Sequence, residues 1–377
     1  MIDRKGRGPL QNPDSSPAPS VPKALPVGHG QSGEYGYDYF FDNTARITEY
    51  KGKSSVLTLP YELDGYCVTE IGNDAFSFRL FLNAVTIPNG VTQIGDRAFS
   101  GCWALASVSI PDSVTQIGSY AFADCNDLTS ISIPSSVTEI GEAAFSFCLF
   151  MNSVTIPDGV TRIGNDAFSH CWSLSSVSVP NSVSTVGANP FSDCKMLTDV
   201  LISPDHPILE FADGVLFDKA QKRLIACLRT RVAAEYTLPQ GTRMIGDRAF
   251  SGCDTLVSVT IPNSVIKIGS GAFSCCGHLR SVTLPSSVTG IDDWAFSGCH
   301  ALSSVTIPDS VTKIGDGAFF WCNQLMSVTL PRSVTDIGKE AFDKCPKDMT
   351  LTVERDSFAA RYCKENGLHY RHPDMLN

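Results

Sequence analysis

Apolar residues recur along this chain at a fixed spacing of 23 residues. The most regular of them is a phenylalanine, preceded by alanine in every repeat but one, at positions Phe76, Phe99, Phe122, Phe145, Phe168, Phe191, Phe250, Phe273, Phe296, Phe319 and Phe342. A period of 20 to 29 residues is typical of a solenoid, in which each repeat forms one coil and buries its apolar residues against the next coil. The spacing therefore predicts one elongated domain.

Each repeat contains two extended segments separated by a turn. In the repeat that ends at Phe122, Val108 and Ile110 alternate with polar residues, which predicts a short strand with both apolar side chains on one face. Pro111 ends this strand because proline has no N–H for the sheet. The segment Val-x-x-Ile-Gly then returns along the second side of the coil, and we expect one helical turn carrying Ala-Phe to complete it.

Equivalents of this strand number about thirteen, from Leu57–Leu59 to Leu351–Val353. Stacked about 4.8 Å apart, they form a parallel sheet roughly 60 Å long. Each repeated phenylalanine then packs on the one in the next coil. We therefore assign these phenylalanines to the core, with a stabilising role and no catalytic one.

Departures from the repeat divide the chain into six segments. The first, residues 1–33, is rich in Pro, Ser and Gly and poor in aromatic residues, so we expect a disordered leader. The others are an N-terminal cap with the first strand at 34–67, repeats at 68–203, an enlarged repeat at 204–239, repeats at 240–353, and a C-terminal helical cap and tail at 354–377.

Two of these segments carry further local signals. Within the enlarged repeat, residues 214–217 and 223–228 predict a hairpin that projects from the stack or folds along it. In the last segment, Ser357 is expected to open a helix that Gly367 closes. Such a helix would cover the apolar end of the solenoid, which needs a cap.

The consensus Cys-x-x-Leu-x-x-Val-x-Ile-Pro-x-x-Val-x-x-Ile-Gly-x-x-Ala-Phe resembles the leucine-rich repeat of the BspA type over about residues 34–370. The resemblance implies an α/β solenoid: a curved leucine-rich-repeat stack of about thirteen coils, with a parallel sheet on one face, short helical turns on the other and caps at both ends. Proteins of this type are often displayed on the surface of host-associated bacteria or protists. The resemblance implies adhesion or recognition, and it does not imply an enzyme.

Charge and hydropathy exclude several partners. The formal net charge is −10 without a basic stripe along the repeat, so neither nucleic acid nor an anionic membrane is an expected partner. The chain has no run of 18 apolar residues, and its first thirty residues lack the apolar core of a secretory signal. These features predict no membrane insertion and favour the cytoplasm, whereas the resemblance implies a protein that is often secreted or at the cell surface. We expect a monomer.

Ten of the fourteen cysteines stand three residues after the repeated phenylalanine. Parallel, stacked cysteines suit the geometry of a disulfide poorly, so we expect a ladder of buried free thiols. No Cys-x-x-Cys pair, convergent histidines or phosphate-binding loop is present, and we therefore expect neither a metal nor a cofactor. His206 beside Asp205 is a possible catalytic pair, for which we prefer the interpretation of a solvated loop. We expect no enzyme.

Positions that the core does not use remain free for recognition. Outward residues of the repeated strands are mostly Ser or Thr, a pattern that suits either ligand hydrogen bonds or simple solubility. Aromatic residues and histidines concentrate instead in the loops after Ala-Phe, which we call the aromatic edge. Its candidate ligand-binding residues are Trp103, Phe147, Phe150, His170, Trp172, His300 and Trp321. These side chains serve either as exposed anchors for a ligand or as additional core under the next coil.

The leading hypothesis is a non-catalytic recognition or adhesion module that binds a protein or a glycan through the sheet face and the aromatic edge. The alternative is an intracellular scaffold for protein interactions, which the absent signal and the unbridged thiols favour.

Overall fold

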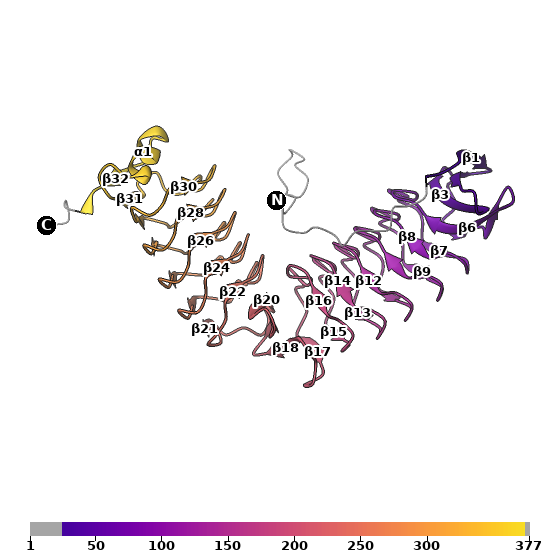
Figure 1. The fold of residues 1–377 in the computed structure, drawn as a ribbon, viewed down its shortest axis with the longest axis horizontal. Coiled ribbons are helices and arrows are strands. Elements are labelled where there is room, and N and C mark those ends of the chain that lie inside the picture. Colours follow the sequence, from indigo (N-terminus) through magenta and orange to yellow (C-terminus); the bar gives the residue numbers. More distant parts are fainter. Residues whose placement is uncertain (1–24, 374–377) are drawn as a thin grey trace.

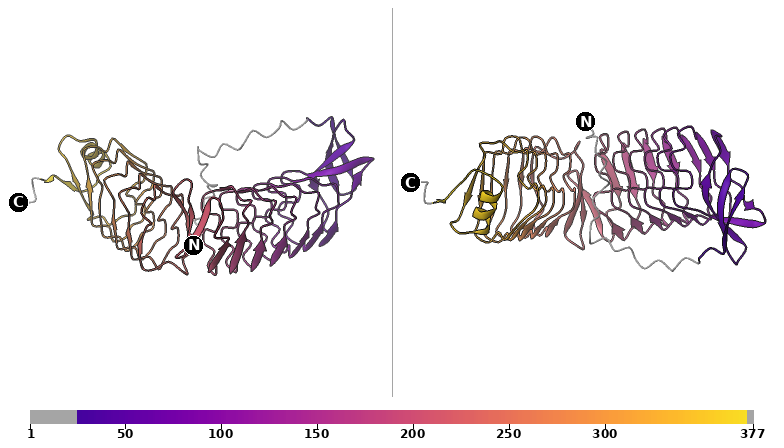
Figure 2. Two further views of the ribbon diagram at one scale, coloured as in Figure 1. Left: turned by 60° about the horizontal axis from the view of Figure 1, so that its bottom comes forward. Right: turned by 90° about the horizontal axis from the view of Figure 1, so that it is seen from above.

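The computed structural model describes residues 25–373, which form a β-solenoid of about fourteen turns. The coils follow one another along a bow whose two arms meet at the enlarged coil, residues 204–239 (Figure 1). We call residues 68–203 the first arm and residues 240–353 the second arm. Two further views show the coils of each arm in a single row (Figure 2). The expected curved stack of about thirteen coils agrees with this architecture.

One face of the solenoid consists of three- and four-residue parallel strands that contain the repeated Val-x-Ile pattern. Instead of one continuous sheet they form four ladders, β4-β7-β9, β11-β13-β15-β17, β21-β23-β25 and β27-β29-β31. Their bounds are β4 Val56–Thr58, β7 Ala84–Thr86, β9 Ser107–Ser109, β11 Ser130–Ser132, β13 Ser153–Thr155, β15 Ser176–Val179, β17 Asp199–Ile202, β21 Glu235–Thr237, β23 Ser258–Thr260, β25 Ser281–Thr283, β27 Ser304–Thr306, β29 Ser327–Leu330 and β31 Thr350–Val353.

A second face is built from two-residue parallel strands, each of which ends in the isoleucine before the repeated glycine except that β16 ends in Val186 and Asp292 follows β26. These strands pair without a break within each arm, and neighbouring isoleucines such as Ile117 and Ile140 are in register. The strands are β8 Gln93–Ile94, β10 Gln116–Ile117, β12 Glu139–Ile140, β14 Arg162–Ile163, β16 Thr185–Val186, β22 Met244–Ile245, β24 Lys267–Ile268, β26 Gly290–Ile291, β28 Lys313–Ile314 and β30 Asp336–Ile337.

The expected helical turn around Ala-Phe is wrong. In its place the chain makes consecutive tight turns, in which the N–H groups of Ala98, Ser100 and Cys102 each donate to the carbonyl three residues earlier. The intervening Phe99 and Gly101 donate instead to the next coil, to the carbonyls of Ala121 and Ala123 at 2.8 Å. Left-handed backbone two residues before and two residues after the phenylalanine prevents a right-handed helix. Among residues 25–373, the only α-helix is α1, Phe358–Glu365.

The phenylalanine ladder forms the centre of the core, as the repeat predicts. Successive rings within each arm stack face to face, for example Phe99 on Phe122 with centroids 5.3 Å apart and an interplanar angle of 3°. The cysteine ladder lies beside them, and the Cys125 thiol donates to the carbonyl of Phe99 at 3.3 Å. Burial raises the pKa of Cys125 well above its ordinary value, which keeps the thiol protonated as a donor. The expected ladder of buried free thiols is confirmed.

Both ends of the solenoid are capped. At the N-terminal end, an antiparallel sheet of β1 Gly28–Ser32, β2 Tyr35–Tyr39 and β3 Thr44–Tyr50 leads into β6 Tyr66–Ile71, which also pairs with β5 Glu62–Leu63. This cap therefore begins at Gly28, within the segment 1–33 expected to be disordered. Tyr50 of β3 continues the ring ladder by stacking on Phe76 at 5.4 Å. The remaining expected leader, residues 1–24, lies outside the described residues.

The C-terminal cap follows the predicted signals. The Ser357 hydroxyl accepts a hydrogen bond from the N–H of Ala360 at 3.1 Å, and helix α1 follows. Gly367 comes two residues after the helix and has a left-handed φ of 66°. A short strand that was not foreseen, β32 Tyr370–Arg371, then pairs in parallel with β31. Buried Ala359 and Cys363 of the helix belong to the core of the second arm.

The enlarged coil contains the predicted hairpin and one additional strand. Strand β19 Val215–Asp218 pairs in antiparallel fashion with β20 Arg223–Cys227, and β18 Leu209–Ala212 pairs with the other edge of β19. Strand β20 also pairs in parallel with β22 of the second arm. The hairpin divides its side chains between two cores: Ile225 and Ala226 pack in the core of the first arm, whereas Leu224 and Cys227 pack in that of the second. It therefore joins the two arms.

His206 is not part of a solvated loop, so this expectation is wrong. Its side chain is 1 % exposed, its Nε2 lies 3.1 Å from the carbonyl of Pro180, and its Nδ1 accepts hydrogen bonds from the N–H groups of Ile208 and Leu209. The imidazole thus fixes the entry into the enlarged coil. The sequence could not show this, because the partners depend on how the loop closes over the previous coil.

The enlarged coil is expected to loosen as the pH falls below about 6.5. Burial lowers the pKa of His206 below its ordinary value of 6.5, so the folded state binds a proton less readily than the unfolded state. Stability from the neutral imidazole is complete above 6.5 and is lost at lower pH, where Nδ1 no longer accepts. The protection factors of the Ile208 and Leu209 amides, which correct for the slower intrinsic exchange at lower pH, should fall between pH 7 and 5 more in the parent than in His206→Gln; an equal fall would contradict this role.

Candidate functional site

The aromatic edge is built on a strained backbone position. The residue two places after each repeated phenylalanine has a positive φ in every coil of both arms: Phe78, Gly101, Asp124, Phe147, His170, Asp193, Gly252, Cys275, Gly298, Trp321 and Lys344. Glycine adopts this conformation at no steric cost and Asp tolerates it, but bulky aromatic residues are rare there. The fold itself is satisfied by glycine at this position, so Phe78, Phe147 and Trp321 are not required by it.

The candidate aromatic side chains are exposed and do not form additional core. Trp103, Phe150 and Trp321 are each more than half exposed, and Phe147 and Trp172 are about 40 % exposed. Three further apolar side chains on the same loops, Phe78, Phe81 and Met196, are more than 60 % exposed. Since exposed apolar area of this kind is unfavourable in water, the loops form a surface suited to a partner.

The structure divides the seven candidates between the two arms. Trp103, Phe147, Phe150, His170 and Trp172 lie on the first arm, whereas His300 and Trp321 lie on neighbouring coils of the second. In the second arm, the His300 ring meets the Trp321 ring edge to face, with centroids 5.0 Å apart. The aromatic edge is therefore two separate patches.

His170 and Trp172 are each engaged with a neighbouring coil. The His170 ring stacks on Phe147 with centroids 4.1 Å apart, and its Nδ1 is buried without a hydrogen-bond partner among the described residues. Burial lowers the pKa of His170, although nearby Asp193 opposes this shift. Above the Trp172 ring, Lys195 places its Nζ 3.4 Å from the centroid, a close cation–π contact. The chain thus already holds one cation on this surface.

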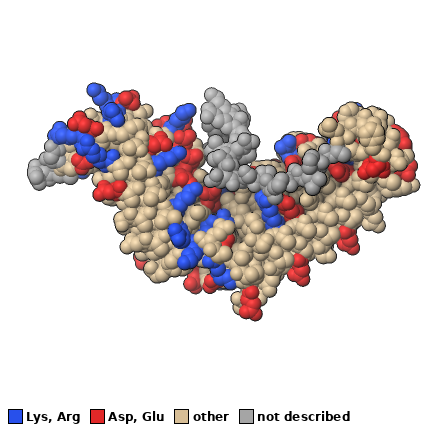
Figure 3. All heavy atoms as spheres, viewed as in Figure 1, with Lys and Arg blue, Asp and Glu red and all other residues tan. Residues whose placement is uncertain are grey.

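Arginines of the enlarged coil join acidic residues of both arms. Arg229 pairs with Asp193 at 2.9 Å and also with Asp254, while Arg231 pairs with Asp199 at 2.9 Å. Isolated acidic side chains stand along the lower margin of the first arm, and most visible Lys and Arg lie toward the second arm and the joint (Figure 3). These pairs separate the two aromatic patches by a charged region.

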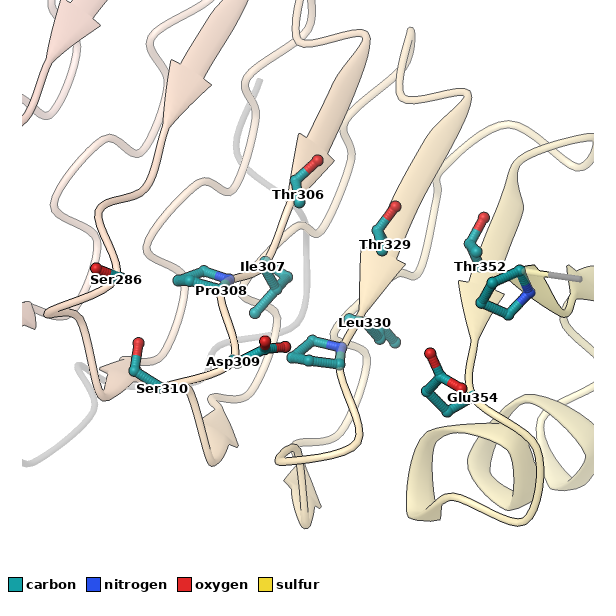
Figure 4. A pocket seen from close by; sticks show the side chains of 12 residues that line it. Ser286, Thr306, Ile307, Pro308, Asp309, Ser310, Thr329, Leu330, Thr352 and Glu354 are labelled. Atoms are coloured by element: carbon teal, nitrogen blue, oxygen red, sulfur yellow. The ribbon is translucent and has the colours of Figure 1, made fainter. Parts of the chain in front are cut away.

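The strand face is polar, with hydroxyls above an apolar floor. Ser107, Ser109, Ser130, Ser132, Ser304 and Thr306 are exposed there. Near the end of the second arm this face has a groove of about 590 Å³, in which Thr306, Thr329 and Thr352 line up on neighbouring strands above buried Ile307 and Leu330 (Figure 4). Its carboxylates are Asp309 and Glu354. The groove offers hydrogen-bonding groups but no nucleophile paired with a base.

A smaller cavity of about 340 Å³ lies beside the enlarged coil. Its polar side chains are those of Glu210, Asp213, Lys219, Lys222, Tyr236 and Gln240, and its lining has no His, Cys or Ser. Burial raises the pKa of Tyr236 to about 12, which keeps the hydroxyl protonated and makes it a poor base at neutral pH.

Residues 25–373 contain neither a metal-binding cluster nor a membrane-spanning helix. No cluster of three or more His, Cys, Asp or Glu side chains in this range is arranged to hold a metal ion. Within the same range, no helix has the length and apolar character needed to cross a bilayer.

Asp124, Asn126 and Lys195 are the relevant residues that the sequence did not single out. Asp124 occupies the left-handed position between Gly101 and Phe147, and Asn126 follows two residues later on the same loop. Their importance depends on which polar atoms find partners, which the sequence does not show. The sequence did offer a signal for Lys195, because this residue occupies the repeat position of Trp172 one coil later.

A parallel β-solenoid built from a 23-residue repeat of leucine, valine, isoleucine and phenylalanine defines the class: a leucine-rich-repeat protein. The model for the BspA type leucine-rich repeat region matches residues 69–198 and 229–348 with 6 copies. The chain belongs to this family.

Solved structures agree with this assignment. A leucine-rich cell surface protein from Faecalibacterium prausnitzii is 31 % identical, with 91 % of this chain and 97 % of that chain covered and a TM-score of 0.70. A leucine-rich repeat protein from Bacteroides ovatus is 27 % identical, with 91 % and 99 % covered and a TM-score of 0.51. The pneumococcal vaccine antigen PcpA shares the fold at 21 % identity, 92 % and 99 % coverage and a TM-score of 0.72. A search of curated proteins finds no match.

Proposed function

We propose that this chain is a non-catalytic recognition module that binds a protein or a glycan through its aromatic edge, with the hydroxyl-rich strand face as a second contact surface. The family and its surface-protein relatives suggest a role in protein interaction or adhesion. The observation that carries the proposal is the set of exposed aromatic residues in left-handed backbone, where glycine serves the fold equally well. Strained residues of this kind are concentrated at functional sites.

Replacing these aromatic residues by glycine should separate binding from folding. Left-handed backbone disfavours a residue with a Cβ atom by about 1 kcal/mol, so Trp321→Gly and Phe147→Gly should remain within about 1 kcal/mol of the parent in urea unfolding. Ligands captured from protein and glycan arrays by the parent should be lost by Phe147→Gly, Trp103→Ala and Trp172→Ala. A loss of several kcal/mol in stability would instead assign these side chains to the core.

The alternative, an intracellular scaffold, is supported by the thiol ladder. All fourteen cysteines lie within the described residues and are unbridged, and most are buried. Free thiols are most common in reducing compartments. Fractionation of the source cells distinguishes the two: recovery of the chain outside the cell favours adhesion, and recovery in the cytosol favours the scaffold.

A further inference from the structure

Two tryptophans of the first arm occupy the same repeat position but have different neighbours. Trp103 and Trp172 each stand four residues after a repeated phenylalanine, and the equivalent residues one coil later are Asn126 and Lys195. Lys195 lies over the Trp172 ring. By the symmetry of the repeat, Asn126 lies on the corresponding side of Trp103, but it brings no positive charge. Trp103 therefore has the same repeat position as Trp172 but no lysine from the next coil over its ring.

The loop of Asn126 carries acceptors that lack donors. Its Oδ1 is buried and has no hydrogen-bond partner among the described residues. Two residues earlier, the half-buried Asp124 carboxylate makes no described hydrogen bond or ion pair, whereas Asp193 at the equivalent position pairs with Arg229 at 2.9 Å. Partial burial without a nearby cation raises the pKa of Asp124. An acceptor without a donor is unfavourable, and a partner that supplies donors to the half-buried Asp124 carboxylate would relieve it.

Basic groups of the first arm are not available to these acceptors. Its four basic residues are all engaged: Arg79 with the carbonyl of Tyr50, Arg97 with Asp74, Arg162 with Glu139 and Lys195 with Trp172. Residues 68–203 hold twelve acidic and four basic residues, whereas residues 240–353 hold ten and nine. The first arm therefore carries most of the net negative charge and attracts a basic partner.

We propose that the first arm binds a polypeptide partner by taking one of its arginine side chains between Trp103 and Phe147. This inference rests on the proposed function and specifies its ligand. The guanidinium stacks on the Trp103 indole, as Lys195 does on Trp172, and donates to the Asp124 carboxylate. Phe147 and Phe150, one coil further, form the opposite wall.

Arginine suits this site better than lysine or a sugar. Its planar guanidinium has five N–H donors and stacks on aromatic faces, so one group can pair with both oxygens of the Asp124 carboxylate while it covers the Trp103 indole. The coil of Asp124 lies one ring spacing, 5.3 Å and 5.5 Å, from the coils on either side. A neutral glycan offers hydroxyl donors but leaves the negative charge of the arm uncompensated.

Paired peptide arrays test the proposal. The full chain is applied to an array of 12-residue peptides in which every arginine-containing sequence has a twin with citrulline, a neutral isostere, and in parallel to a glycan array. We expect bound peptides to contain arginine and their citrulline twins to bind at least tenfold more weakly. If lysine and arginine peptides bind alike, the site recognises a positive charge but not a guanidinium, which would overturn the assignment to arginine. An array without bound peptides would overturn the proposal.

Three variants locate the site. Asp124→Asn should weaken binding about tenfold and remove the preference for arginine over citrulline; it keeps the shape of the side chain, and Asn tolerates left-handed backbone as well as Asp does. Asp158→Asn, on an exposed proline turn of the same arm, makes the same charge change and should have no effect. Asn126→Lys should cover Trp103 from within the chain and abolish binding.

The outcomes separate this inference from the proposed function. The arginine site would be overturned if the captured ligands depend on Trp103 but bind equally to the parent and to Asp124→Asn, or if only glycans bind. Either result would leave the recognition module intact. Ligands insensitive to Trp103→Ala, Phe147→Gly and Asp124→Asn would overturn both. Urea unfolding of each variant confirms that lost binding is not lost structure.

Discussion

Phe122→Ala is expected to lower the free energy of unfolding by about 3 to 5 kcal/mol. The Phe122 ring is fully buried and lies between Phe99 and Phe145, with centroids 5.3 Å and 5.5 Å away. Hydrogen bonds between coils on both sides hold this spacing, for example from the N–H of Phe122 to the carbonyl of Ala144 at 2.8 Å. Because the coils cannot close over the gap, most of the cavity will remain.

Urea unfolding followed by circular dichroism measures this change. Phe81→Ala, which removes the same side chain from an 81 % exposed position, is the matched control and should stay within about 0.5 kcal/mol of the parent. A loss below 1 kcal/mol for Phe122→Ala would show that neighbouring coils relax into the space, which would contradict a rigid ladder.

Gly141→Ala should destabilise the first arm by about 1 to 3 kcal/mol or more. A Cβ atom at this position would lie 2.5 Å from the carbonyl carbon of Gly118 and 2.6 Å from the nitrogen of Ser119, both backbone atoms of the previous coil. To admit it, the coils must separate and lengthen the 2.9 Å hydrogen bond from Gly141 to Ile117. Asp292 shows this effect naturally, because its N–H lies 3.2 Å from the carbonyl of Ile268.

Gly290→Ala provides the contrast for this prediction. The nearest atom to a Cβ at Gly290 is 4.0 Å away, and the residue has no positive φ, so alanine should be neutral or stabilise the fold by reducing the freedom of the unfolded chain. Thermal unfolding of the two variants should therefore shift in opposite directions or differ by several degrees. Equal shifts in melting temperature would show that the intrinsic conformational preference of alanine, and not the close approach of coils, determines the effect.

The sequence predicts those parts of the fold that depend on contacts within one repeat period. Val108 and Ile110 lie on a strand, Phe122 is stacked, and Ser357 caps a helix because each follows from local pattern. The helical turn was wrong because left-handed positions such as Arg97 and Phe147 carry no glycine to mark them. Only hydrogen bonds to the next coil hold such residues in that conformation.

The candidate site could be predicted only in part. The unrepeated aromatics are visible in the sequence, but their exposure depends on how closely the next coil approaches, which no pattern encodes. Asp124 and Asp193 have the same repeat position and look equivalent in the sequence. The structure distinguishes them because Arg229, 36 residues after Asp193, folds back onto Asp193, whereas Asp124 has no ion pair among the described residues.

The hairpin of β19 and β20, whose side chains pack in the cores of both arms, changes how this solenoid should unfold. Repeat arrays usually behave as a row of nearest-neighbour units, so one arm could melt while the other persists. Here the adjacent residues Leu224 and Ile225 belong to the cores of different arms. Melting either core therefore exposes part of strand β20 and removes the end coil of the other arm. We therefore expect the enlarged coil to transmit loss of structure from arm to arm, and a calorimetric trace to show one transition where two separate arms would give two.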